Sequence, residues 1–460
     1  MTLVDDIVRG VEARDKANPA IASFLPFVKP DAANPVRIAA NLGILAATHL
    51  GSFEATHYRL VDKAKHYFPG SKALSSNTTR NHIAHITSLD EEIERGYDEA
   101  SMDRVFDYVL DAHTQAATVT GALDPDRSIA VLDGKPLPFY GKSYTYGSSR
   151  RRHRDEMTPA GQRTNPAFRG HKREPGTRRT YPGTSNTIDW LNLTRYDPIT
   201  QFNGGEMFRR LPYGRRLDAI VADVAPRLDA RPPWILMADK EFAREEMLNV
   251  LMGVRRRTGC HVMVARPVDP RTRVADELRR MWADPARVHI IEGAERGYAF
   301  WGLTKLEWTA SHQPYPLLAL YRTVPPKDDT FEPSRLDISL TVDGRELPVF
   351  VNAFLCTFEE PFVKANAACV ERVFSRRWSG ENVNKKTARH APHSPSKRFL
   401  PRHLTYGWGL MMQDLWHLWR CKEERAEPKR RWHPSRTFAL YRADLRDCLL
   451  PYALKHPGET

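Results

Sequence analysis

The chain has 460 residues, a net charge of +13 and a hydrophobic content of 41%, which excludes a disordered protein and allows two or three packed domains. The basic excess suits a polyanionic partner, because each Lys or Arg that neutralises a phosphate releases condensed counterions. A basic enzyme acting on a small anionic substrate fits the same charge. Five cysteines without a C-x-x-C pair argue against a disulfide framework and favour a reducing compartment.

The start of the chain and its apolar runs bear on where the protein acts. The sequence MTLVDDIVRG carries acidic residues where a signal peptide needs basic and then apolar ones. The longest apolar runs, such as Leu317 to Leu320, are too short to cross a bilayer. We therefore expect a soluble protein with no membrane partner, located in the cytoplasm and associated with the nucleoid.

Residues 1–120 are predicted to be helical, because apolar residues recur at helical spacing in 38–50, 53–67 and 102–117. Within this region THYRLVDKAKHYF, Pro-Gly-Ser and ALSSNTTRNHIAHI resemble a helix-turn-helix. An ordinary helical bundle with a solvated face has the same pattern. In the DNA-binding interpretation, four polar residues of the second helix face a DNA groove: Asn77, Thr78, Arg80 and Asn81.

Two short apolar segments end in an aspartate and mark the start of a different region. SIAVLD ends at Asp133, and WILMAD ends at Asp239. A strand at 187–193, helices at 215–228 and 241–257 and a strand at 260–267 complete a strand and helix alternation. This alternation predicts an α/β fold with helices on the faces of a sheet, over 121–266.

Three further regions are distinguished by composition. The segment 148–180 is polar and rich in Arg, and it reads either as a solvated loop or as a phosphate-contacting one through Arg150, Arg151 and Arg152. Consecutive strand patterns fill 267–360, which we interpret as a β-rich insertion. The chain returns to helix in 361–425 and ends in a basic tail at 426–460.

Carboxylates at strand ends can bind metal. Two aspartates that converge from separate strands repel each other unless they share a proton or a cation, and carboxylate oxygens suit Mg²⁺ or Mn²⁺. Strand-end aspartates that only cap the next helix give the same pattern. On a helix, Glu381 would share one face with Arg377 and Lys385. That glutamate is then either a third ligand beside DNA-binding cations or a member of an exposed ion-pair ladder.

Together these segments resemble the DDE (Asp-Asp-Glu) transposases of prokaryotic insertion sequences, in the branch with a β-rich insertion between the second Asp and the Glu. The matching motifs are DGKPLPFYGK from Asp133, ADKEF at Asp239 and FSRRWSGE, which ends at Glu381. The resemblance covers about 128–420 and implies a ribonuclease-H-like mixed sheet. Two positions depart from the family pattern, since Gly380 precedes the glutamate and Ala388 occupies the place of the signature lysine.

The resemblance implies cut-and-paste transposition with two Mg²⁺ or Mn²⁺ ions. The DNA partners are the terminal inverted repeats of the element and the target, and a homodimer synapses two ends. In related enzymes a tryptophan of the insertion stacks on a flipped base, which makes Trp301 and Trp308 candidates. Core packing is the commoner explanation for such aromatic residues. A catalytically inert DNA-binding descendant and a nuclease without strand transfer remain alternatives.

Three further patterns bear on metal binding, nucleotide hydrolysis and packing. The histidines His390, His393 and His403, near Cys421, follow no standard zinc spacing. No G-x-x-x-x-G-K-[ST] motif is present, so nucleotide hydrolysis has no support. A stripe at helical spacing around Met411, Met412 and Leu415 predicts a core-facing helix.

Overall fold

The structure is a computed structural model. Its description covers residues 19–29, 32–48, 72–87, 99–139, 186–210, 217–239, 242–266, 268, 271, 273–284, 286, 288–290, 299–307, 314–322, 334–342, 344–359, 361–363, 365, 399–426 and 438–455. The chain forms two compact units, each built from separate stretches of sequence. The first unit comprises 1–124, 134–215 and 381–460, and the second comprises 125–133 and 216–380.

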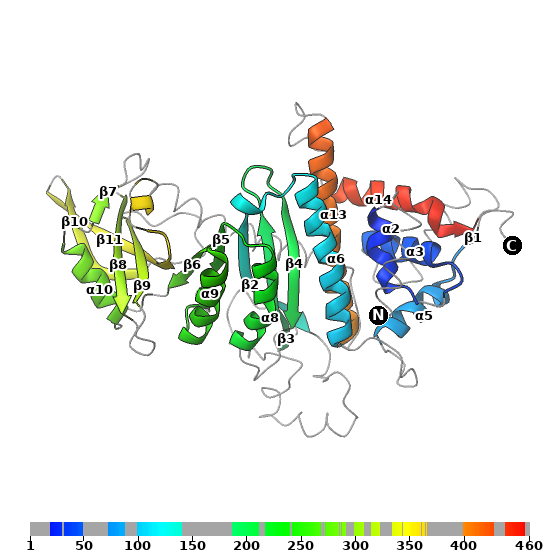
Figure 1. Ribbon diagram of the computed structural model, residues 1–460, viewed down its shortest axis with the longest axis horizontal. Coiled ribbons are helices and arrows are strands. Elements are labelled where there is room, and N and C mark those ends of the chain that lie inside the picture. Colours follow the sequence, from blue (N-terminus) through cyan, green and yellow to red (C-terminus); the bar gives the residue numbers. More distant parts are fainter. Residues whose placement is uncertain are drawn as a thin grey trace, which may run out of the picture. The chain divides into compact units, whose positions relative to one another are not determined.

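The first unit is mainly helical (Figure 1). Its helices are α2 (Pro19–Phe24), η1 (Leu25–Phe27), α3 (Pro35–Thr48), α5 (Ser76–Thr87), α6 (Glu99–Val119), α13 (Phe399–Ala426) and α14 (Phe438–Ala453). Its strands are the antiparallel pair β3 (Asn186–Tyr196) and β4 (Asn203–Arg210), the short antiparallel pair β1 (Lys72–Ala73) and β12 (Leu454–Lys455), and the part of β2 (Ile129–Phe139) from Gly134 onward.

The helices of the first unit begin and pack as their sequences dictate. Asn34 precedes α3, and its Oδ1 accepts a hydrogen bond from the backbone N–H of Arg37 at 3.0 Å, which caps the helix. Both α6 and α13 pack against β4. The stripe predicted on α13 is confirmed as core, since Met411 and Met412 are fully buried. Burial of apolar faces like this one supplies most of the stability of such helices.

The second unit is a mixed sheet with helices (Figure 1). Its helices are η2 (Pro125–Arg127), α8 (Leu217–Ala230), α9 (Glu245–Thr258) and α10 (Arg273–Trp282). Besides β2 up to Asp133, its strands are β5 (Ile235–Ala238), β6 (His261–Arg266), β7 (Val288–Ile290), β8 (Ala299–Glu307), β9 (Pro314–Arg322), β10 (Ser334–Val342) and β11 (Arg345–Cys356). Their order is β2-β5-β6-β11-β9-β8-β7, with β10 paired to β11.

Three parallel strands form the centre of this unit. β2 pairs with β5, and β5 with β6, both in parallel register. The connection from β5 to β6 runs through α9, as parallel neighbours require a crossover. Gly259 ends α9 in the left-handed region at φ 76°, and its N–H bonds the Arg255 carbonyl at 2.7 Å. The four residues of β5 are all buried, which explains their continuous apolar sequence.

The predicted α/β fold class is confirmed as a mixed sheet with helices. The strand patterns predicted within 267–360 form β7 to β11, but this stretch also contains α10. β11 pairs antiparallel with β6, so these strands continue the sheet of the parallel core. In the described ranges no helix is long and apolar enough to span a bilayer.

Strand β4 was not predicted, because its sequence opens with Asn203, Gly204 and Gly205, which are weak strand formers. The structure gives the reason for the two glycines. A Cβ on Gly205 would lie 2.9 Å from Cδ2 of Leu410, and one on Gly204 would lie 2.8 Å from Oδ1 of Asp414. Glycine therefore lets β4 pass directly against α13.

Candidate active site

The two predicted strand-end aspartates follow paired positions of neighbouring parallel strands. The prediction was wrong for Asp133, which lies inside β2 because this strand continues to Phe139, whereas Asp239 directly follows the last residue of β5. The register pairs Leu132 of β2 with Ala238 of β5, and the next residue along the chain is an aspartate in both cases, Asp133 and Asp239. Neighbouring strands are about 4.8 Å apart, and paired residues project to the same face of a sheet. The ladder therefore brings the two half-buried carboxylates to one level at the same edge of the second unit.

The turn that follows Asp239 is fixed by backbone contacts. The N–H of Phe242 donates to the carbonyl of Asp239 at 3.0 Å, and the side chain of Phe242 is fully buried. Ala243 is buried as well, and its carbonyl accepts a hydrogen bond from Nη1 of Arg266 at 2.9 Å. Phe242 and Ala243, which lie between the aspartate and α9, are thus held by hydrogen bonds and by burial.

This edge can hold a divalent cation on chemical grounds. Two carboxylates side by side repel each other, and oxygen ligands of this kind suit Mg²⁺ or Mn²⁺. Among the described residues, no group of three or more His, Cys, Asp or Glu side chains is arranged to hold a metal ion. The predicted third ligand, Glu381, lies outside the described residues, as do Arg377 and Lys385.

The residues predicted to contact DNA are only partly described. Asn77, Thr78, Arg80 and Asn81 all lie in α5. Ser75 caps this helix, since its Oγ accepts from the N–H of Thr78 at 3.1 Å.

Burial is described for only part of α5. Ile83 and Ile86 are buried, whereas Asn81 is exposed. The first helix of the predicted helix-turn-helix lies outside the described residues, and so do Arg150, Arg151 and Arg152. Trp301 lies in β8, with Leu320 as its backbone partner, and Trp308 is outside the description.

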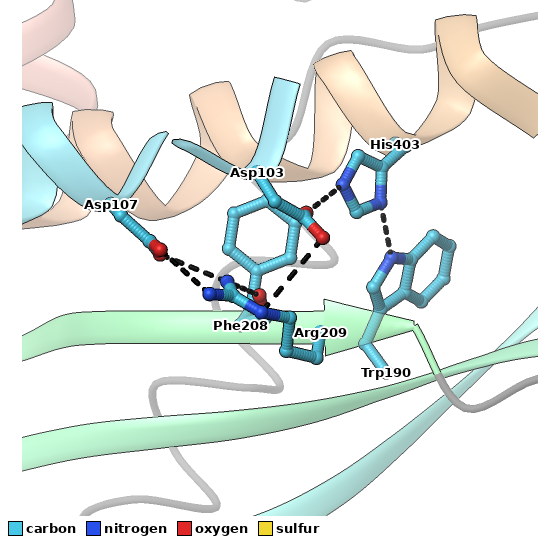
Figure 2. Close-up of polar contacts among 6 residues, drawn as sticks. All are labelled: Asp103, Asp107, Trp190, Phe208, Arg209 and His403. Atoms are coloured by element: carbon cyan, nitrogen blue, oxygen red, sulfur yellow. Dashed lines mark hydrogen bonds and ion pairs between the residues drawn. The ribbon is translucent and has the colours of Figure 1, made fainter. Parts of the chain in front are cut away.

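A buried polar network that sequence reasoning missed lies in the first unit (Figure 2). Nε1 of Trp190 donates to Nδ1 of His403 at 3.0 Å, so the ring proton of this fully buried histidine is on Nε2. That Nε2 donates to Oδ1 of Asp103 at 2.8 Å. The guanidinium of Arg209 bonds both carboxylate oxygens of Asp107, at 2.9 and 2.6 Å. These contacts join α6, α13, β3 and β4.

The network settles the role of one histidine considered as a zinc ligand. Both ring nitrogens of His403 are engaged, one by Trp190 and one by Asp103, which leaves no lone pair for a metal. Cys421 is buried in an apolar cluster with Ala117 and Phe202. The signal in the sequence was the histidine in the first turn of an apolar helix, but its partners lie 213 and 300 residues away.

Comparison with known proteins was made at the level of families, curated sequences and solved structures. No family model and no curated protein matches the chain. Among solved structures, it is similar to a piggyBac transposase, described as a cryo-EM structure of a synaptic complex with hairpin DNA. The TM-score is 0.45 and the identity 8%, over 98% of this chain and 78% of the other. At this level of similarity, the assignment of a function depends on the residues of this chain.

Proposed function

We propose that the protein is a DNA transposase whose active site consists of Asp133, Asp239 and Glu381. The observation that carries the proposal is the register of β2 and β5, in which the last pair is followed along the chain by Asp133 on one side and Asp239 on the other. Adjacent carboxylates, one within a strand and one directly after a strand, would form half of a site for divalent metal. Glu381 is proposed as the third ligand because it ends the motif FSRRWSGE, which resembles the glutamate motif of the family.

The aspartates would hold Mg²⁺ or Mn²⁺, and Glu381 would close the site. When bound, two such ions neutralise charge on the attacking and leaving oxygens of an in-line displacement at phosphorus. Asp133 and Asp239 would orient the reacting phosphodiester only through the ions that they hold, because carboxylates alone repel a phosphate. The same carboxylates serve hydrolysis at the transposon end and attack of the freed 3′-OH on target DNA, because both are displacements at phosphorus.

The DNA partner would be bound by basic and polar groups outside the carboxylate edge. In this proposal α5 reads the terminal inverted repeats through Asn77, Thr78, Arg80 and Asn81, while Arg377 and Lys385 contact phosphates near Glu381. Arg150, Arg151 and Arg152 add phosphate contacts. The net charge of +13 supports a polyanionic partner. A homodimer would pair two element ends, and the enzyme would act in a prokaryotic cytoplasm, at the nucleoid.

An inert DNA-binding descendant is the second candidate. It is favoured by Gly380 immediately before Glu381 and by Ala388 where the family motif has lysine. Glycine lowers helix stability by about 1 kcal/mol relative to alanine, which would loosen the segment that carries the glutamate. Such a protein would keep salt-sensitive binding without cutting.

A cleavage assay tests the proposal. Purified protein is incubated with labelled DNA that carries the flanks of its own gene and with unlabelled target, in Mg²⁺ or Mn²⁺. We expect specific cuts and joined products, both lost in Asp133→Asn, Asp239→Asn and Glu381→Gln, with DNA binding kept. Asp223→Asn is the matched control, because this aspartate is exposed on α8.

Each outcome of this assay selects one function. Cutting without joined products would identify a nuclease. Salt-sensitive binding without cutting by the unmodified protein would identify an inert descendant. Cutting at the wild-type rate by any of the three variants would remove that residue from the site.

A further inference from the structure

The position of Asp239 is not fixed by the sheet alone. β5 ends at Ala238, whose partners are Leu132 of β2 and Val264 of β6. Asp239 is the first residue beyond this ladder, so its carboxylate depends on the turn through Phe242 and Ala243. A metal ligand must be held within about 0.5 Å of its productive position, and residues that orient ligands are therefore important for affinity.

Arg266 lies where it can hold this turn. It is the last residue of β6, and its backbone is paired with Ala353 of β11. From this anchored position Nη1 donates to the carbonyl of Ala243 at 2.9 Å, across 23 residues of sequence. The bond joins the carboxyl end of β6 to the segment four residues after Asp239.

The burial and charge of Arg266 favour a side chain that is held in one position. The side chain is half-buried, and burial lowers the pKa of its guanidinium below the ordinary value. A guanidinium remains charged in proteins, and its planar fork loses little freedom when it bonds a carbonyl. Burying a charge costs free energy unless it is hydrogen-bonded. The bond to the carbonyl of Ala243 therefore offsets part of the cost of burying the guanidinium.

The geometry points to Arg266 as a positioning residue that holds Asp239 in place for metal binding by bracing the carbonyl of Ala243. This inference rests on the proposed metal-dependent function and adds to it a residue that is not itself a ligand. Loss of a residue that orients a metal ligand typically weakens metal affinity about 10- to 100-fold. We expect an effect of about 10-fold, because the N–H of Phe242 still constrains the turn.

The chain offers a matched control in Arg255. Its Nη1 donates to the carbonyl of Cys260 at 3.1 Å, directly before β6 begins at His261. This is the same kind of bond, from a partly buried arginine to a backbone carbonyl, at the opposite end of the same strand. Arg255→Gln therefore reproduces the loss of a bond and a charge without touching the turn after Asp239.

The experiment measures Mn²⁺ binding to the full chain without DNA, by the electron paramagnetic resonance signal of free Mn²⁺. We expect Arg266→Gln to weaken Mn²⁺ affinity about 10-fold, with Arg255→Gln within two-fold of wild type and Asp239→Asn losing the site. Arg266→Lys keeps the charge without the fork, and an intermediate loss is expected. If Arg266→Gln does not fold, the lysine variant carries the test.

Failure of the positioning role and failure of the proposed metal site give different results. Wild-type affinity in both Arg266 variants, with Asp239→Asn defective, overturns the positioning role and leaves the metal site intact. An equal loss in Arg255→Gln overturns it too, since the effect would then be a general loss of stability. No Mn²⁺ binding by the wild type, or unchanged binding by Asp239→Asn, overturns this inference together with the proposed function.

Discussion

The charge state of a buried aspartate on α13 should control the pH dependence of stability in the first unit. Asp414 is 1% exposed, and burial raises its pKa from 3.8 to about 6, while its contacts with His113 and the N–H of Gly205 lower the pKa and the charge of Glu206 raises it. Oδ1 accepts from the N–H of Gly205 at 2.7 Å, and Oδ2 lies 3.5 Å from Nδ1 of His113. Deprotonation of Asp414 is therefore less favourable in the folded protein than in the unfolded chain.

The sign and size of the change in unfolding free energy with pH follow from the difference between the folded and unfolded pKa values. The pKa is higher in the folded state, so the stabilisation from protonation is fully present below the unfolded value of 3.8 and is lost as pH rises through about 6. A shift of roughly two pH units corresponds to about 3 kcal/mol, of which about 2 kcal/mol is lost between about pH 4 and 7. Asp414→Asn keeps an acceptor for Gly205, adds a donor for His113 and does not titrate.

We expect the free energy of unfolding of Asp414→Asn, relative to wild type, to rise by about 2 kcal/mol from about pH 4 to 7. Urea unfolding across this range gives the difference, and hydrogen exchange of α6 and α13 peptides assigns the transition to the first unit. Asp111→Asn, at a partly exposed position of α6, is the control for the replacement of an aspartate in the same unit. A difference that is flat or falls with pH would refute the reasoning.

Two further predictions concern packing and charge. Gly407→Ala should destabilise the first unit by about 1–3 kcal/mol despite the better helix propensity of alanine. The reason is that the new Cβ would lie 2.2 Å from Cζ of the buried Phe106. Thermal unfolding measures the effect, and an unchanged midpoint would show that the packing around Phe106 accommodates a methyl group without cost. Replacing Arg150, Arg151 and Arg152 with Ala should reduce the slope of log DNA affinity against log salt concentration by up to about 3. DNA-binding titrations at several salt concentrations measure this slope. An unchanged slope would exclude phosphate contact by these three residues.

The sequence by itself was sufficient for local elements. Helices such as α3 and α6 and the central strands β2, β5 and β6 lie where periodicity and apolar runs predict them. Strands that are buried on both faces are continuously apolar, which made these segments recognisable as strands. The strand end before Asp239 was predicted correctly, whereas β2 continues past Asp133 to Phe139. Glu381 lies outside the described residues and stays a prediction.

The tertiary structure decided which strands are neighbours and which polar residues are buried. Nothing local in the sequence states that β2 lies beside β5, although this places the two aspartates together. Strand β4 was missed because its glycines are explained only by contact with α13. His403 and Asp414 are polar residues on a helix, and their burial depends on partners that are hundreds of residues distant. Long-range packing, which no window of sequence contains, sets both the sheet order and the pKa of such groups.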